Sequence, residues 1–388
     1  MERARLIEGL REFAGEALVE RDGAYFLVDP GWGERERAQW AALAVRRPAG
    51  WDGREGWLCV PTGGSSGALK LARHDETTLG AAVEGFTQFF EVDRVAALGL
   101  LPPWHVSGLM AWARSAWTGG TYRTAQWREV EAGRQRPPSA GLYLSLVPTQ
   151  LARLLGDAEA EAWLRGFRVV FLGGGPAGRE LTQRARVAGL PLALCYGSTE
   201  TAAMVTVQRP EEFLSGNETA GRPLPHARLG LDDEGRLTVA GTSLFRGYWP
   251  DARAEADGPW RTDDLGKIDA AGRLTILGRA DALIISGGEK VNPAEVEAVL
   301  RNWVGATWRD VAVVGVPHAE WGEEVVALFV AAAEKAGDVE VQVRARVAEG
   351  LAVAKRPKRY IEVAAERWPV NASGKLDRVA LRALAQSG

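Results

Sequence analysis

The first 200 residues alternate between short apolar runs and segments with helical periodicity. In the first helical segment, Asp75 can cap the N-terminus, and Leu79 and Phe86 fall on one face. The strand-like runs cover residues 57–60, 95–102, 142–148, 168–175 and 191–197. Because strands separated by helices form mainly parallel sheets with covered faces, we expect an α/β fold whose large N-terminal domain has parallel-rich sheets and covering helices.

The pattern changes near residue 226, where hairpin-like segments replace the alternation of strands and helices. Residues 227–241 contain two alternating runs around a turn with glycine, and residues 267–279 repeat that design. Two such runs joined by a glycine-containing turn are typical of a β-hairpin. We therefore expect a β-hairpin-rich part at the end of the large domain.

From Asp281 onward the pattern predicts a small α+β module. A helix is expected to begin after the capping residue Asn292, two apolar strands follow it, and a second helix is expected near 339–350. We therefore divide the chain into a large N-terminal domain of residues 1–280 and a small C-terminal domain of residues 281–388. The length of 388 residues also exceeds what one core usually supports.

Composition excludes several classes of protein. The net charge of -3 and the scattered basic residues predict no basic surface that would bind nucleic acid. No run approaches the roughly 18 apolar residues of a membrane span, and the N-terminus lacks the apolar core of a signal peptide. Two cysteines, Cys59 and Cys195, predict no disulfide framework, and the four histidines lack metal-ligand spacing. We expect a cytoplasmic monomer or homodimer that acts on small molecules.

The most distinctive local segment is residues 62–70, TGGSSGALK. Glycines let the backbone approach an anion closely, and hydroxyls and a lysine donate to phosphate oxygens. It is not a Walker loop, because two residues separate the last glycine from Lys70. Residues 63–67 also match G-x-S-x-G, which would make Ser65 the nucleophile of an α/β-hydrolase, and glycine with serine is typical of flexible linkers. Taken alone, the segment leaves these three interpretations open.

Five further segments follow this loop: 173–176 (GGGP), 196–201 (YGSTET), 260–266 (WRTDDLG), 278–291 and 369–378 (PVNASGKLDR). In this order the six segments resemble the adenylate-forming superfamily of acyl-CoA synthetases, luciferases and peptide-synthetase adenylation domains. The resemblance runs from about residue 57 to 380. It implies an AMP-forming acid–thiol ligase that uses ATP, Mg²⁺ and coenzyme A.

The resemblance assigns ATP-binding roles to three of these segments. It implies that Thr199 contacts phosphate, that Glu200 binds Mg²⁺ and that Tyr196 lies against the adenine. These assignments agree with the preference of Mg²⁺ for carboxylate and phosphate oxygens. Glycines of the nucleotide site are Gly173, Gly174, Gly175 and Gly197. Loop residues at the phosphates are Thr62, Gly64, Ser65, Ser66, Gly67 and Lys70.

The ribose and the domain hinge fall on the next two segments. The resemblance implies that Asp264 and Arg279 hold the ribose, although Asp263 replaces the usual glycine and leaves open which carboxylate does so. It also implies that the small domain rotates about Asp281. Rotation would bring Gly287 and Gly288 into the site for thioester formation.

The last segment contains Lys375, which the resemblance places between the substrate carboxylate and the α-phosphate. An acid that attacks ATP brings two anions together, so positive groups must offset their repulsion and stabilise the charge of the transition state. Lys375, with Mg²⁺ on Glu200 and with Thr199, is the expected source of that stabilisation. The second step, thiol attack on the acyl-adenylate, does not need Lys375.

The choice of acid depends on residues 101–109, LPPWHVSGL. This segment is similar to the corresponding segment of o-succinylbenzoate–CoA ligases, which serve menaquinone and phylloquinone biosynthesis. Residues 145–151 and 244–248 also resemble that subfamily, as does the early position of the glycine loop. Expected lining residues of the acid pocket are His105, Ser107, Gly108 and Thr201. An aryl or other acyl-CoA ligase of the same superfamily, and the hydrolase with Ser65, are the alternatives.

Overall fold

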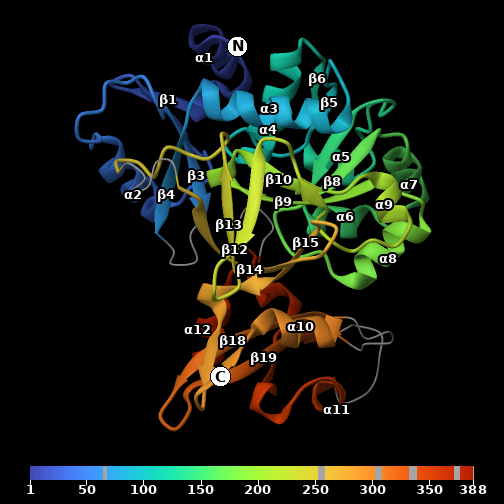
Figure 1. The fold of residues 1–388 in the computed structure, drawn as a ribbon. Helices are drawn as coiled ribbons and strands as arrows, with labels where there is room; N and C mark the ends of the chain where they lie inside the picture. The colour runs from blue at the N-terminus through green and yellow to red at the C-terminus, as the bar shows by residue number, and fades with distance from the viewer. Residues whose placement is uncertain (64–67, 252–257, 302–307, 332–338, 371–375, 388) are drawn as a thin grey trace.

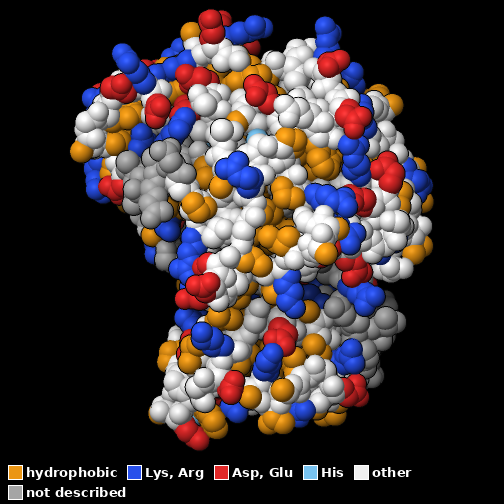
Figure 2. All heavy atoms as spheres, viewed as in Figure 1, with side chains coloured by type: hydrophobic (Ala, Val, Ile, Leu, Met, Phe, Trp, Pro, Cys, Tyr) orange, Lys and Arg blue, Asp and Glu red, His pale blue; other side chains and the backbone are white. Residues whose placement is uncertain are grey.

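The structure is a computed structural model that describes residues 1–63, 68–251, 258–301, 308–331, 339–370 and 376–387. Three sheets with their helices form the upper body in Figure 1, and a fourth sheet forms the smaller body below. Figure 2 shows acidic and basic side chains interspersed over both bodies on the face in view. Among the described residues, no helix has the length and apolar character needed to cross a membrane.

The first sheet has the order β1-β2-β3-β4 and carries the glycine-rich loop at one end. Its strands are β1 (Leu18–Arg21), β2 (Ala24–Leu27), β3 (Leu58–Gly63) and β4 (Leu69–His74), accompanied by α1 (Arg3–Ala14), η1 (Gly15–Ala17) and α2 (Glu34–Ala44). Strands β3 and β4 pair antiparallel, with Thr62 opposite Lys70. Helix α3 (Glu76–Phe90) then begins as the sequence predicts, because the Asp75 carboxylate accepts the backbone N–H groups of Thr77 and Thr78.

The second sheet has the order β11-β10-β9-β8-β7-β5-β6. Its strands are β5 (Ala97–Gly99), β6 (Tyr122–Thr124), β7 (Tyr143–Leu146), β8 (Val169–Leu172), β9 (Leu192–Ser198), β10 (Ala203–Val207) and β11 (Arg222–Pro223). Pairing is parallel from β6 to β9 and antiparallel at β10 and β11. The predicted parallel-rich sheet is thereby confirmed.

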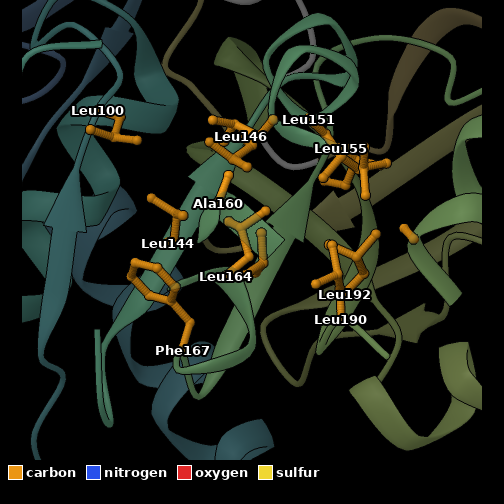
Figure 3. Packing of buried hydrophobic residues seen from close by; sticks show 14 of the residues in the cluster. Leu100, Leu144, Leu146, Leu151, Leu155, Ala160, Leu164, Phe167, Leu190 and Leu192 are labelled. Carbon is orange, nitrogen blue, oxygen red and sulfur yellow. The ribbon is translucent and has the colours of Figure 1, made fainter. Parts of the chain in front are cut away.

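Helices cover both faces of this second sheet, as parallel strands require. On one face α6 (Pro148–Leu154), α7 (Ala158–Arg165) and α8 (Arg179–Val187) pack through a leucine-rich cluster that includes Leu144, Leu164 and Leu192 (Figure 3). On the other face Phe86 and Phe90 of α3 contact the sheet, next to α4 (Val106–Thr118). The remaining helices of this region are α5 (Trp127–Glu131) and α9 (Pro210–Leu214).

The third sheet consists of the two predicted hairpins, β12 (Ala227–Leu231) with β13 (Arg236–Gly241) and β14 (Trp260–Ile268) with β15 (Leu274–Arg279). Before β14, residues 245–249 lie along β4 as an additional extended segment. Arg73 N donates to Gly247 O at 3.0 Å, and Trp249 N donates to Leu71 O at 2.8 Å. This pairing links the hairpin part to the glycine-rich loop.

The fourth sheet belongs to the predicted α+β module and has the order β17-β16-β19-β18, with β20 parallel to β19. Its elements are β16 (Ile284–Ser286), β17 (Glu289–Val291), α10 (Pro293–Arg301), β18 (Trp308–His318), β19 (Gly322–Ala331), α11 (Val339–Gly350), η4 (Val353–Lys355), β20 (Arg359–Glu362), η5 (Ala365–Arg367) and α12 (Arg378–Ser387). Its two hydrophobic clusters begin at Ile284, whereas those of the rest of the chain end at Leu274. The cores therefore separate between these two residues.

Candidate active site

The β3–β4 hairpin presents the flanks of the glycine-rich loop. Lys70 is exposed, and its Nζ lies 5.1 Å from the ring centroid of Tyr248. Gly64, Ser65, Ser66 and Gly67 lie outside the described residues, so their contacts with phosphate stay predictions. Because β4 follows the loop as a strand, the strand-to-helix turn of a hydrolase nucleophile elbow does not occur there, which argues against Ser65 as a nucleophile.

The turn after β9 holds the expected magnesium carboxylate. Glu200 lies in the 3-10 helix η2 (Thr199–Thr201) and is only 6% exposed. Its Oε1 accepts a hydrogen bond from the Tyr248 hydroxyl at 2.8 Å, and its backbone oxygen accepts from Phe245 N at 2.8 Å. One carboxylate oxygen is thereby fixed by the protein, and a cation at the other oxygen stays a prediction.

Other features of this turn fit a magnesium–nucleotide complex. The described residues contain no group of three or more His, Cys, Asp or Glu side chains arranged for a metal. A single carboxylate suits Mg²⁺ that takes its other ligands from phosphates and water. Thr199 adjoins this carboxylate, and His74 Nε2 lies 2.7 Å from the Thr199 carbonyl oxygen. Burial lowers the pKa of His74, so the imidazole is neutral.

Two of the expected glycines are required by close packing. At Gly197 a Cβ atom would lie 1.9 Å from the carbonyl oxygen of Ala203, which no side chain tolerates. At Gly173 a Cβ atom would lie 2.8 Å from Cys195 Sγ. Gly174 has a φ of +77°, a conformation that favours glycine, and Gly175 follows it. These glycines keep the carboxyl edge of β8 and β9 open.

The expected ribose residues come together at the edge of the third sheet. Tyr196 donates its hydroxyl proton to Asp264 Oδ2 at 2.6 Å, and Asp264 lies opposite Arg279 in the β14–β15 register. Burial raises the pKa of Tyr196 and of Asp264. The Asp264 side chain is 20% exposed, whereas the Asp263 side chain is 52% exposed and lies near Arg236. The geometry favours Asp264 as the carboxylate that faces a nucleotide beside Tyr196.

Arg279 also contacts the expected hinge residue. Its Nε and Nη2 each donate to the Asp281 carboxylate at 2.7 Å, and its Nη1 lies 3.7 Å from Asp264 Oδ1. The bond to Asp281 raises the pKa of Arg279. Asp281 lies in the 3-10 helix η3 (Ala280–Ala282), directly between the separate cores. The hinge role of Asp281 stays a prediction.

The small domain places the expected thioester loop at the turn between β16 and β17. Gly287 and Gly288 have φ values of +59° and +84°, and Gly287 N donates to Trp321 O at 2.9 Å. Lys375 lies outside the described residues, so its contact with the substrate stays a prediction. Val370 and Leu376, on either side of its segment, form a β-bridge.

The four expected lining residues of the acid pocket occupy two places. His105, Ser107 and Gly108 lie at the start of α4, where a Cβ atom on Gly108 would lie 2.1 Å from Pro102 O. Thr201 is buried, and its hydroxyl lies 2.6 Å from Ala203 O and 3.1 Å from Ser198 O. Since this hydroxyl already bonds within the turn, a role for Thr201 at the acid stays a prediction.

A buried arginine that the motifs did not identify lies deeper along α4. Arg114 is 4% exposed and lines a small enclosed cavity with Tyr143, Ser145 and Phe171. Its guanidinium carbon lies 4.4 Å from the ring centroid of Phe86, and its Nε has no hydrogen-bond partner among the described residues. Burial lowers the pKa of Arg114 to about 10. The only signal in the sequence is one arginine within the apolar run 108–117.

This cavity lies beneath the glycines of the second sheet. Side chains alternate along a strand, so Phe171 and Gly173 share one face of β8. Phe171 pairs with Ser145 on β7 and with Ala193 on β9. The cavity therefore lies two residues, about 7 Å, below the glycine turn.

The geometry matches a known class of enzyme. The sequence profile of the AMP-binding enzyme family matches residues 46–249, and that of the AMP-binding enzyme C-terminal domain matches residues 295–375. The chain therefore belongs to the AMP-binding enzyme family, and the predicted membership of the adenylate-forming superfamily is confirmed.

Two similar members of this family are 2-succinylbenzoate–CoA ligases, one compared by sequence and the other by structure. The 2-succinylbenzoate–CoA ligase of Listeria monocytogenes serotype 4b (strain F2365) is 31% identical over 338 residues, which cover 86% of this chain and 71% of that protein. The o-succinylbenzoate CoA synthetase of Bacillus subtilis in complex with the acyl-adenylate intermediate OSB-AMP is 28% identical with a TM-score of 0.72, over 85% of this chain and 69% of that one. The structure of the same synthetase in complex with ATP and magnesium ion is also 28% identical. Its TM-score is 0.70, over 84% of this chain and 70% of that one.

Proposed function

We propose that this chain is an ATP-dependent acid–CoA ligase that converts 2-succinylbenzoate into its CoA thioester through an acyl-adenylate. The activity of similar proteins supports this proposal. The nucleotide is expected beside Tyr196, Asp264 and Arg279. The observation that carries the choice of acid is Arg114, a buried cation below the glycine turn.

A buried guanidinium without a partner is costly, because its charge loses the hydration of water. Among the described residues no carboxylate pairs with Arg114, so a ligand anion is the natural partner. 2-Succinylbenzoate carries two carboxylates and one aromatic ring. One carboxylate reacts with ATP, and the other is expected to approach Arg114, which lines a small cavity with Phe86 and Phe171.

In the first step the acid attacks the α-phosphate of ATP and pyrophosphate leaves. Glu200 would hold Mg²⁺, whose positive charge would offset the repulsion between the two anions. Lys375 is expected to bridge the attacking carboxylate and the α-phosphate, and Lys70 is expected to meet the departing pyrophosphate. Positioning carries most of the acceleration, since no residue has to act as a nucleophile.

In the second step the thiol of coenzyme A attacks the acyl-adenylate and AMP leaves. We propose that the large domain is residues 1–280, that the small domain is residues 281–388, and that the small domain rotates about Asp281 between the steps. The separate cores on either side of this residue support such a rotation. Rotation would withdraw Lys375 and bring Gly287 and Gly288 to the site. We also propose a cytoplasmic location, where ATP and coenzyme A are available.

The test is acid-dependent ATP–pyrophosphate exchange over a panel that includes 2-succinylbenzoate, benzoates and fatty acids. Exchange is expected with 2-succinylbenzoate above the other acids. In Arg114→Gln the KM for this diacid should rise about 10²-fold or more, as breaking a buried ion pair does, while any weak exchange with a monoacid changes little. Arg94→Gln, at an exposed arginine, is the matched control. A preference for a fatty acid, or covalent labelling of Ser65 by a fluorophosphonate with activity in the absence of ATP, would contradict the proposal.

A further inference from the structure

Tyr248 occupies a position between the glycine-rich hairpin and the magnesium carboxylate. It pairs with Ala72 of β4 through an isolated antiparallel bridge. On either side, Arg246 N donates to Arg73 O at 2.8 Å and Trp249 N donates to Leu71 O at 2.8 Å. The backbone of Tyr248 is therefore held in register with the strand that leaves the glycine-rich loop.

The side chain of Tyr248 contacts two residues, one through its hydroxyl and the other through its ring. Its hydroxyl donates to Glu200 Oε1 at 2.8 Å, and its ring lies 5.1 Å from Lys70 Nζ. Phe245 packs edge-on against the same ring, with 4.8 Å between the centroids. The Tyr248 ring therefore has little freedom, and the direction of its hydroxyl is fixed by the sheet.

We propose that Tyr248 is a positioning residue for the metal site: it holds one oxygen of Glu200 so that the other oxygen faces Mg²⁺. The proposal rests on the proposed function, which makes Glu200 the magnesium ligand. An ionised carboxylate only accepts hydrogen bonds, so a phenol proton at Oε1 orients the group without competing for the metal at Oε2. Hydrogen-bonding partners of ligating carboxylates typically contribute 10–100-fold to metal affinity.

One substitution distinguishes the hydroxyl contact of Tyr248 from its ring contacts. Tyr248→Phe removes the hydroxyl and retains the ring, so the support of Lys70 and the packing on Phe245 persist. The variant should therefore lose metal affinity and keep its affinity for pyrophosphate in the absence of metal. A general loss of structure would lower both affinities together.

Binding of Mn²⁺ to the enzyme–ATP complex, followed by electron paramagnetic resonance without any acid, tests the proposal and involves no turnover. In Tyr248→Phe the dissociation constant of Mn²⁺ should rise 10–100-fold, with pyrophosphate binding in EDTA unchanged. The matched control is Tyr360→Phe in the small domain, where a tyrosine ring also lies under a cation, Arg344, at 4.2 Å. This control should leave Mn²⁺ binding as it is.

Glu200→Gln in the same assay distinguishes the positioning role of Tyr248 from the assignment of Glu200 as the metal ligand. If Glu200→Gln weakens Mn²⁺ binding and Tyr248→Phe does not, the positioning role is overturned while the metal assignment stands. If neither substitution weakens it, the assignment of Glu200 to the metal, and with it that part of the proposed function, fails. A lower melting temperature of Tyr248→Phe with unchanged Mn²⁺ affinity also overturns the positioning role.

Discussion

His74 Nε2 lies 2.7 Å from the carbonyl oxygen of Thr199, although 125 positions separate the two residues in the sequence. The carbonyl can only accept, so Nε2 carries the proton, and Nδ1 faces Thr78 Oγ1 at 3.0 Å. His74 is the last residue of β4, the strand that leaves the glycine-rich loop. This contact therefore sets the turn with Thr199 and Glu200 at a fixed distance from the β3–β4 hairpin.

Substitutions at His74 should separate its hydrogen bond from its bulk. In His74→Leu the buried Thr199 carbonyl loses its donor, which should lower the free energy of unfolding by about 1–3 kcal/mol. The turn with Glu200 is then no longer held in place, so kcat/KM for ATP–pyrophosphate exchange should also fall. His74→Gln can present an N–H near the position of Nε2 and should recover most of the activity. Equal losses in the two variants would show that the ring, and not its bond to Thr199, is what matters.

The motifs predicted the elements of the site better than the contacts between them. The strands β8 and β9 and the hairpins around residues 227–279 are confirmed, because their signals are local: apolar runs and turn glycines. The helices and strands before residue 57 were not predicted. Local patterns also could not show that residues 245–249 lie along β4, since strand neighbours depend on the packing of the whole chain.

The same limit applies to Arg114. The sequence shows one arginine within an apolar run, but it does not show that the guanidinium is buried against Phe86. Only the register of β7, β8 and β9 shows that this cation lies below the glycine turn. Likewise, the choice between Asp263 and Asp264 needed the side-chain exposures, which adjacent positions of one motif do not specify.

The two aspartates give a paired prediction. Asp264 accepts the Tyr196 hydroxyl and is mostly buried, whereas Asp263 faces solvent near Arg236 and Arg279. Asp264→Asn should raise the dissociation constant of ATP at least 10-fold, because hydrogen bonds to a charged acceptor contribute about 1.5–3 kcal/mol. Asp263→Asn should change it less than 3-fold. Isothermal titration of ATP into both variants checks the pair, and a larger effect at Asp263 would reverse the assignment.

Gly197 is expected to tolerate no side chain. In Gly197→Ala the new methyl group would meet the Ala203 carbonyl oxygen at 1.9 Å, so β9 and β10 must move apart. Overpacking of this kind costs about 1–3 kcal/mol. Gly178→Ala is the matched control, because its φ is -62° and no atom lies within 4 Å of the added Cβ. Urea unfolding should show a lower midpoint for Gly197→Ala alone, and equal midpoints for the two variants would refute the packing argument.

Buried His226 should make the free energy of unfolding depend on pH. Its ring nitrogens are buried, and burial, with a smaller effect of Arg114, lowers its pKa to about 4. Below pH 6.5 the unfolded chain takes up a proton at this histidine and the folded chain does not, so stability falls as the pH decreases toward 4. Between pH 7.5 and 5.5 the loss from this group is about 1.3 kcal/mol. In His226→Gln the free energy of unfolding should change less over this interval, and an unchanged slope would exclude His226 as the source.

Lys375 should be needed for one step of the reaction and dispensable for the other. The attack on ATP brings two anions together and requires a cation between them, whereas thiol attack on the acyl-adenylate does not. In Lys375→Ala adenylate formation, measured as ATP–pyrophosphate exchange, should fall by about 10²–10³-fold or more. Thioester formation from supplied acyl-adenylate and coenzyme A should stay within a few fold of the unmodified enzyme.

Lys290→Ala, at an exposed lysine on β17 of the same domain, controls for the loss of a positive charge from that domain. Parallel losses in both steps would show that Lys375 stabilises the small domain and does not act on the first transition state.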